Sequence, residues 1–167
     1  MDINFKKSCS LRIGPRCEID CISVRSLTGS LFPSVNTMRY LGAYIVRAKH
    51  FKCSLDQAKR SFYRAANCIF GKIGRIASEE VILQLVKTKC MPILLYSLET
   101  YPLKKADFRS LDFTVDRFFM KLFQTNNMDT VRLCQEYFNF ELPSVTIVRR
   151  TSKFQCKSQC KFSSIVS

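Results

Sequence analysis

The amino-acid sequence predicts an α+β fold that is mostly α, in which a small antiparallel β portion precedes a helical bundle. In short runs up to about residue 50, polar and apolar residues alternate, as in strands with one buried face. From Phe51 onward, apolar residues recur every three or four positions, as in amphipathic helices. Apolar residues make up 47% of the 167 residues and include 14 Phe and 6 Tyr, which is enough for a packed core.

Residues 1–50 are expected to be rich in β-structure. Residues 10–13 alternate in polarity and stop at Gly14-Pro15, and residues 21–25 alternate again before a turn at Thr28-Gly29-Ser30. Residues 38–46 are expected to form the longest strand. Gly42 inside it indicates a bulge or a close approach of the backbone to another group.

Residues 51–154 are expected to form the helical bundle. The first helix follows Ser54, which fits a capping box with Gln57, and it carries arginines opposite an apolar face. That face consists of Leu55, Ala58, Phe62, Ala65, Ala66, Ile69 and Ile73. A second helix begins at Ser78 and is kinked by Pro92. Its core positions are Val81, Ile82, Leu85, Val86, Ile93 and Leu94.

Three further helices are expected in the C-terminal part. One covers residues 104–123, a shorter one covers residues 128–137, and a last one covers residues 144–154. The first of these has a core stripe of Phe108, Leu111, Val115, Phe118, Phe119 and Leu122. Residues 155–167 are expected to form a basic tail that frays.

The charge of the chain indicates its partner. There are 27 Lys and Arg residues against 13 Asp and Glu residues, which gives a formal net charge of +14, and no acidic residue follows Glu141. A field of this sign attracts phosphate backbones without reading their sequence. Nucleic acid is therefore the expected partner. A solubilising surface and an anionic membrane surface are the alternatives.

No membrane span and no secretory signal are expected. No apolar run approaches the roughly 20 residues that a membrane helix needs. The charged N-terminal residues are not followed by an apolar stretch. An intracellular location, in the nucleus or the cytoplasm, is expected.

The nine cysteines are expected to be reduced thiols, because their number is odd and no secretory signal precedes them. Zinc is the alternative, on the spacing of Cys17 with Cys21 and of Cys156 with Cys160. The two pairs lie far apart in the sequence. The single histidine, His50, is interpreted as a surface residue.

Chemistry that depends on paired acids is not expected. No Asp-Asp pair and no glycine-rich phosphate loop occur in the sequence. Asp112 and Asp116 share a helix face, but their surroundings indicate a solvated helix edge. No metal site is therefore predicted.

Two motifs and one longer block carry a family resemblance. Asn4-Phe-Lys-Lys-Ser8 is followed, after turns and short strands, by Arg39-Tyr40-Leu41-Gly42. The block is residues 76–96, which end in Pro-Ile-Leu-Leu-Tyr and are followed by Glu99. In this order, over about residues 3–154, they resemble the distal part of a reverse transcriptase of the non-LTR (LINE-type) retrotransposon family.

The resemblance implies a palm rim, residues 1–50, followed by a thumb, residues 51–154. Lys7 matches a palm lysine near the incoming nucleotide, and Tyr40, Leu41 and Gly42 match the primer grip. The acids that hold magnesium in the family precede Asn4 there and lie outside this sequence. Because phosphoryl transfer needs metal-held groups, the chain is expected to be catalytically incompetent alone and to bind no cofactor.

The function expected from the resemblance is non-specific binding of a primer–template backbone. Arg60, Arg64 and Arg75 are added to the expected nucleic-acid-binding residues from their helical spacing, with a solvated face as the alternative. One competing hypothesis is a structural or interaction protein that self-associates through exposed apolar surface. Others are a translated retroelement fragment without a function and a polymerase subunit completed by another chain.

Overall fold

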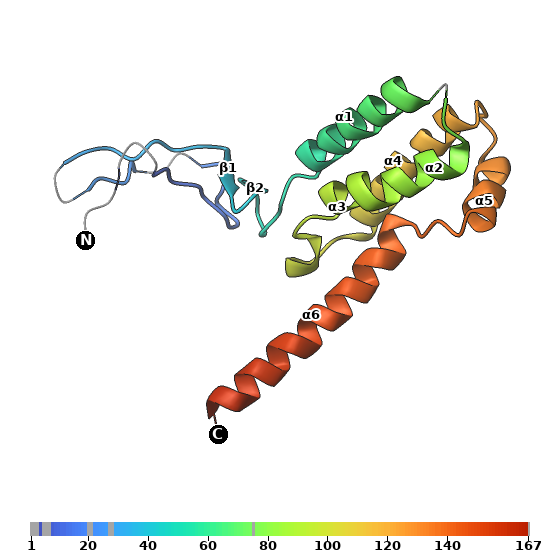
Figure 1. Cartoon of the computed structure of the whole chain (residues 1–167). Coiled ribbons are helices and arrows are strands. Elements are labelled where there is room, and N and C mark those ends of the chain that lie inside the picture. Colours follow the sequence, from blue (N-terminus) through green and yellow to red (C-terminus); the bar gives the residue numbers. More distant parts are fainter. Residues whose placement is uncertain (1–3, 5–7, 20–21, 27–28, 75, 167) are drawn as a thin grey trace. The chain divides into compact units, whose positions relative to one another are not determined.

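The computed structural model of the chain is mostly helical, with one two-stranded antiparallel sheet before the helices, as the sequence predicts (Figure 1). The structure describes residues 4, 8–19, 22–26, 29–74 and 76–166, with side chains as far as Cys156. The chain divides into two compact units, Met1–Leu55 and Asp56–Ser167. The first unit extends past residue 50 because the N–H of Ser54 donates to the carbonyl of Tyr44 at 2.7 Å and pairs this segment with the sheet.

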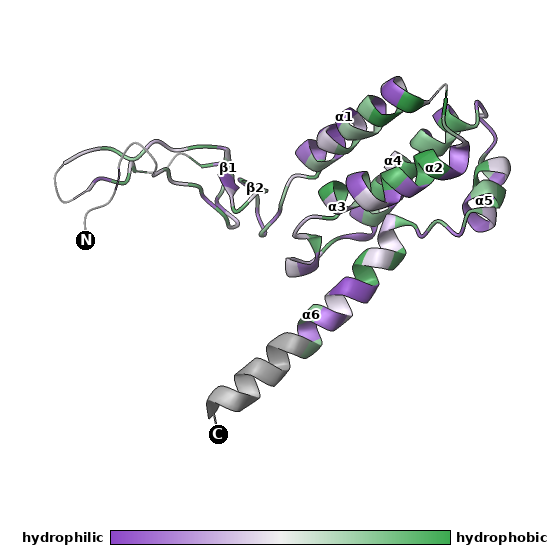
Figure 2. Ribbon diagram, in the orientation of Figure 1, coloured by the Kyte–Doolittle hydropathy of each residue, from purple (hydrophilic) through white to green (hydrophobic). Residues whose placement is uncertain are grey.

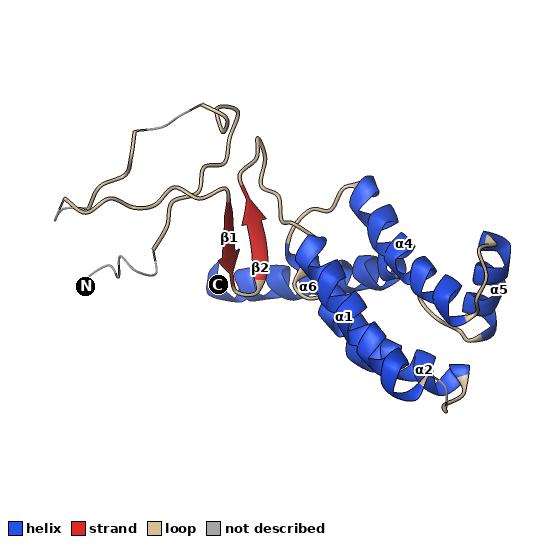
Figure 3. Cartoon of the chain, turned by 90° about the horizontal axis from the view of Figure 1, so that it is seen from above, coloured by secondary structure: helices blue, strands red, loops and turns tan. Residues whose placement is uncertain are grey.

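The sheet is a hairpin of β1 (Thr37–Tyr40) and β2 (Ala43–Val46), drawn as red arrows in Figure 3. The prediction of one strand over residues 38–46 is therefore wrong. Leu41 has φ 46° and Gly42 has φ 84°, so two consecutive residues with positive φ reverse the chain. This is the backbone of a type I′ turn, in which Gly42 is a turn residue rather than a bulge.

The predictions of strands over residues 10–13 and 21–25 are also wrong. Residues 10–13 make only isolated bridges, from Ser10 to Ser34 and from Ile13 to Ala48. Pro33 has no N–H to donate, and Gly14-Pro15 ends the second pairing, so neither bridge extends into a ladder. Of residues 21–25, Cys21 lies outside the described residues and Arg25 makes a single bridge to Leu31.

Helix α1 (Asp56–Ile73) begins within one residue of the start that the capping box predicts. Its apolar face is confirmed, because Phe62 and Ala66 are buried and the other predicted positions are buried or half-buried. Edge-to-face packing of Phe62 on Phe118, with ring centroids 6.3 Å apart, joins α1 to α4 (Lys105–Leu122).

The second helix is interrupted. Helix α2 (Glu79–Leu85) follows Ser78 as predicted and continues into a π-helical turn, η1 (Val86–Cys90), and then α3 (Met91–Leu94). The π turn ends two residues before Pro92, which has no N–H for the α-helical bond to the residue four positions earlier.

The core stripe of this second helix is corrected in part. Ile82, Val86 and Leu94 are buried as predicted, whereas Val81 and Ile93 are exposed. The wider π turn changes which positions face the core. Three residues that were not predicted are buried: Leu83, Cys90 and Met91.

The C-terminal helices surround the aromatic core. After a 3₁₀ turn, η2 (Leu98–Thr100), α4 buries the predicted positions from Leu111 to Leu122, and Phe108 is half-buried. Helix α5 (Met128–Tyr137) has the predicted bounds. The ring of Phe119 packs edge-to-face on Phe140, with centroids 5.1 Å apart, and so joins α4 to the segment after α5.

Helix α6 (Pro143–Val166) is longer than predicted and leaves the bundle in Figure 1. The expected end at Phe154 and the frayed tail, residues 155–167, are replaced by continuous helix to Val166. No Gly or Pro lies between Ser144 and Val166 to end it. Its described outer part is hydrophilic, with purple bands in Figure 2.

The hairpin turn gives a stability prediction. Leu41→Asn should stabilise the hairpin by about 1 kcal/mol, because the left-handed conformation is costly for Leu and common for Asn before Gly in type I′ turns. Hydrogen exchange of the β2 amides measures this as increased protection. Gly42→Ala is the opposed control and should reduce protection. Unchanged protection in Leu41→Asn would contradict the assigned turn.

Candidate nucleic-acid interface

The hairpin presents an apolar tip. Tyr40 is 59% exposed, Leu41 is 75% exposed, and Gly42 is also exposed. Behind the tip, the guanidinium of Arg39 lies 6.0 Å from the ring centroid of Tyr44. A leucine in the left-handed region is costly, and here most of its surface stays exposed. Strained residues of this kind are common at ligand-binding sites.

The structure describes two of the three arginines that the sequence adds to the nucleic-acid-binding residues, and both lie on α1. Arg60 and Arg64 are exposed and lie four residues apart, so they share one face of the helix. Ion pairs within the described part of the chain join Arg132 to Asp129 and Arg149 to Glu141, and neither involves α1. Arg75 and Lys7 lie outside the described residues.

Two hydrogen bonds between side chains join α1 to α4 along the seam where the two helices pack. The ammonium of Lys59 donates to the hydroxyl of Ser110, and the ammonium of Lys121 donates to Oδ1 of Asn67 at 2.9 Å. The same Lys121 ammonium lies 5.1 Å from the ring centroid of Phe70. Lys59 and Ser110 form the contact that is earlier in both helices, and Asn67 and Lys121 form the one that is later in both. Helices α1 and α4 therefore run side by side in the same direction.

This seam brings further cations next to the arginines of α1. Arg64 is one turn before Asn67, which binds Lys121, and Arg117 is one turn before Lys121 on α4. Arg117 is exposed, with its guanidinium 5.9 Å from the ring of the exposed Phe113. We name this surface the α1–α4 basic face. It consists of Arg60, Arg64, Arg117 and Lys121.

The α1–α4 basic face resembles a backbone-binding surface in its chemistry. Arginine and lysine side chains bind phosphate oxygens, and Arg117 and Phe113 place a cation beside an exposed ring. Sequence reasoning missed Arg117 and Lys121. Their spacing of four on a predicted helix indicates that they share a helix face. Only the packing of α4 along α1 reveals that this face adjoins Arg60 and Arg64.

The aspartates of α4 serve the fold. Asp112 and Asp116 are half-buried, so their interpretation as a solvated edge is wrong. Oδ1 of Asp112 accepts from the N–H of Ser144 at 2.9 Å, which caps α6 from another helix. Oδ1 of Asp116 accepts from Nε2 of Gln135 at 2.8 Å and ties α4 to α5. Burial raises the pKa of Asp116.

Among the described residues, no three His, Cys, Asp or Glu side chains lie close enough to hold a metal ion. Cys17 is buried and Cys156 is exposed, whereas Cys21 and the side chain of Cys160 are outside the described part. The zinc pairs therefore stay untested.

Burial raises the pKa of Cys90 to about 11, which keeps this thiol protonated and unreactive. His50 is exposed, as expected.

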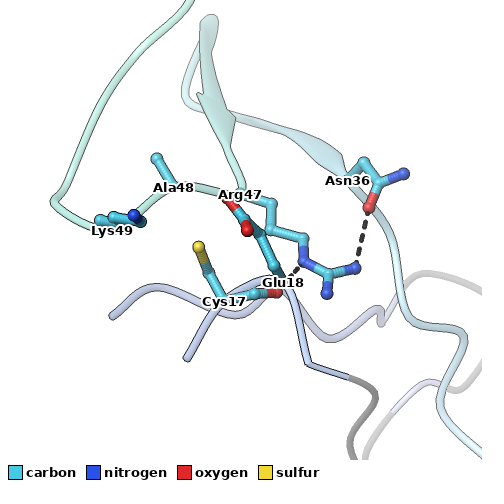
Figure 4. A pocket seen from close by; sticks show the side chains of 6 residues that line it. All are labelled: Cys17, Glu18, Asn36, Arg47, Ala48 and Lys49. Carbon is cyan, nitrogen blue, oxygen red and sulfur yellow. Dashed lines mark hydrogen bonds between the residues drawn. The ribbon is translucent and has the colours of Figure 1, made fainter. Parts of the chain in front are cut away.

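An open pocket in the first unit is built around one arginine side chain (Figure 4). Its central group is the guanidinium of Arg47, whose Nε donates to the carbonyl of Cys17 and whose Nη1 donates to Oδ1 of Asn36 at 3.3 Å. Arg47 thereby ties two irregular segments to the end of β2. Glu18, Ala48 and Lys49 complete the lining.

No protein-family model, curated protein sequence or solved structure matches the chain. The resemblance to a reverse transcriptase therefore stays a prediction that rests on the quoted residues. Within the described residues, none of the helices combines the length and apolarity needed to cross a bilayer.

The carboxyl of Asp116 gives a pH prediction. A raised folded pKa means that the native state holds the proton more tightly than the unfolded chain does. Stability is therefore lost as the pH rises from the usual pKa of 3.8 through the raised value. Asp116→Asn keeps an oxygen acceptor for Gln135 without the buried charge. It should match the parent at low pH and exceed it at pH 7.

Urea unfolding followed by circular dichroism from pH 3 to 8 measures this difference. Asp116→Ala is the control, because it leaves the buried amide of Gln135 without its acceptor and should lose about 1–3 kcal/mol at every pH. If Asp116→Asn were the less stable protein at pH 7, burial would not be the dominant effect on this carboxyl.

Proposed function

We propose that the chain binds nucleic-acid backbones without sequence preference and does not polymerise nucleotides alone. The observation that carries the proposal is the α1–α4 basic face, where four cations lie together on two packed helices. Three of them are exposed arginines, and neither of the ion pairs found among the described residues involves them. Fixed cations of this kind release counterions from a polyphosphate and so favour binding at low salt.

The hairpin tip is the second contact of the proposal. The resemblance assigns Tyr40, Leu41 and Gly42 to a primer grip, and the exposed apolar tip supports a contact role. Glycine at the turn leaves the backbone uncovered on the side that a strand approaches. The resemblance also places the magnesium-holding acids outside this sequence, so the chain is expected to incorporate no nucleotide with magnesium present.

Replacing the arginines should lower the salt dependence of binding. Each lost phosphate contact reduces the slope of log K against log salt by about 0.9 on duplex DNA, so Arg60→Ala with Arg64→Ala should reduce it by about 1.8. Fluorescence anisotropy with a labelled primer–template duplex at several salt concentrations measures the slope. Arg132→Ala, an exposed arginine on α5, is the matched control and should leave it unchanged. If the affinity of the wild-type chain did not change with salt concentration, the proposal would be refuted.

The hairpin variant separates stability from binding. Leu41→Asn should weaken duplex binding although it stabilises the turn, because the apolar contact is removed. The same anisotropy titration measures the loss. Equal binding by Leu41→Asn and the parent would remove the tip from the interface and leave the α1–α4 basic face as its only described part.

A protein-docking function is the second candidate, and one observation favours it. The first unit has a groove of about 670 Å³ whose lining includes the apolar residues Ile19, Ile22, Val24, Leu31 and Phe32. Exposed apolar surface of this kind is typical of interaction sites. Gel filtration with and without nuclease discriminates the candidates. Self-association that survives nuclease favours protein docking, and a shift that nuclease abolishes favours nucleic acid.

A further inference from the structure

A second polar pocket lies in the helical unit, between α2 and the end of α5. It has a volume of about 330 Å³ and combines an exposed aromatic ring with amide and charged side chains. The residues that matter here are Glu80, Gln84, Lys87, Tyr137 and Asn139. None of them belongs to the α1–α4 basic face or to the hairpin.

The packing of the residues at the end of α5 explains why an aromatic ring is exposed here. Phe138 stacks on Phe123 with ring centroids 5.7 Å apart, and Phe140 is buried against the core. Two alternate rings are thereby packed, and Tyr137 is left 83% exposed. Its ring packs edge-to-face on Phe138 at 5.0 Å, so a packed neighbour holds the ring while its surface stays accessible.

The polar groups of the pocket complement a nucleotide. The Lys87 ammonium donates to the carbonyl of Asn139 at 3.3 Å, which places a cation at the pocket where a phosphate can bind. The amides of Gln84 and Asn139 can donate to and accept from the edge of a base, and the carboxylate of Glu80 can accept from an exocyclic amine. An aromatic face beside a cation is the usual combination for binding single strands.

We propose that this pocket binds an unpaired base of a single-stranded nucleic acid, stacked on Tyr137 with its phosphate on Lys87. The proposal rests on the proposed function and deepens it, because it names the form of nucleic acid that the helical unit prefers. Bases in a duplex are stacked and paired with one another, so their faces are not available to the tyrosine. The site therefore distinguishes a strand from a duplex.

The test compares the full chain with Tyr137→Ala on a 15-nucleotide single strand and on a blunt duplex of that length, at one salt concentration. Tyr137→Ala should weaken strand binding about 5- to 150-fold, the usual loss for one stacked base, and leave duplex binding unchanged. Tyr137→Phe should keep the affinity because it keeps the ring. Leu133→Ala removes an exposed apolar side chain one turn earlier on α5 and should have no effect.

The outcomes separate this inference from the proposed function. If the parent binds neither probe, the proposed function fails. If the parent binds both and Tyr137→Ala binds the strand equally well, only the base site fails. Equal losses on strand and duplex would also overturn it, as would tighter binding of free AMP than of the strand. Thermal unfolding of Tyr137→Ala should match the parent, because the side chain is exposed.

Discussion

The packing of aromatic rings around α4 is the constraint on which the helical unit depends. Phe118 packs against α1 through Phe62, and its neighbour Phe119 packs against Phe140 after α5. Buried aromatic side chains contribute large apolar areas, and edge-to-face pairs add about 0.5–1.5 kcal/mol beyond that burial. One helix thereby fixes α1 on one side and the exit of α5 on the other. The same packing brings the cations of α1 and α4 together and leaves Tyr137 exposed.

The sequence predicts helices better than strands here, for a physical reason. Helical hydrogen bonds are local, so the spacing of Leu111, Val115 and Phe118 already specifies both the helix and its buried face. Strands need a distant partner, and alternation in residues 10–13 does not say whether one exists. The hairpin shows the same limit, because its turn depends on the φ angles of Leu41 and Gly42 rather than on polarity.

The candidate site follows the same division. Arg60 and Arg64 are predictable because they lie on one helix at a spacing that sequence reveals. Their neighbours on α4 are not, because nothing local indicates that Lys121 reaches Asn67 across a seam between two helices. Tyr137 is missed for a related reason. Its exposure depends on which of the adjacent rings, Phe138 or Tyr137, packs on Phe123, and both are aromatic.

Three acids of the second unit serve the fold, so the positive surface depends on where they lie as well as on composition. Asp112 caps α6, Asp116 binds Gln135, and Glu141 forms a two-bond pair with Arg149 at 2.7 and 2.8 Å. Each of these carboxylates lies between two elements of the second unit, where it holds the bundle together. Charges committed to internal contacts do little to neutralise distant cations, because the interaction falls with distance and with salt. The bundle thus leaves Arg60, Arg64 and Arg117 as exposed positive groups on the outer side of these helices, which is the surface on which the proposed phosphate contact depends.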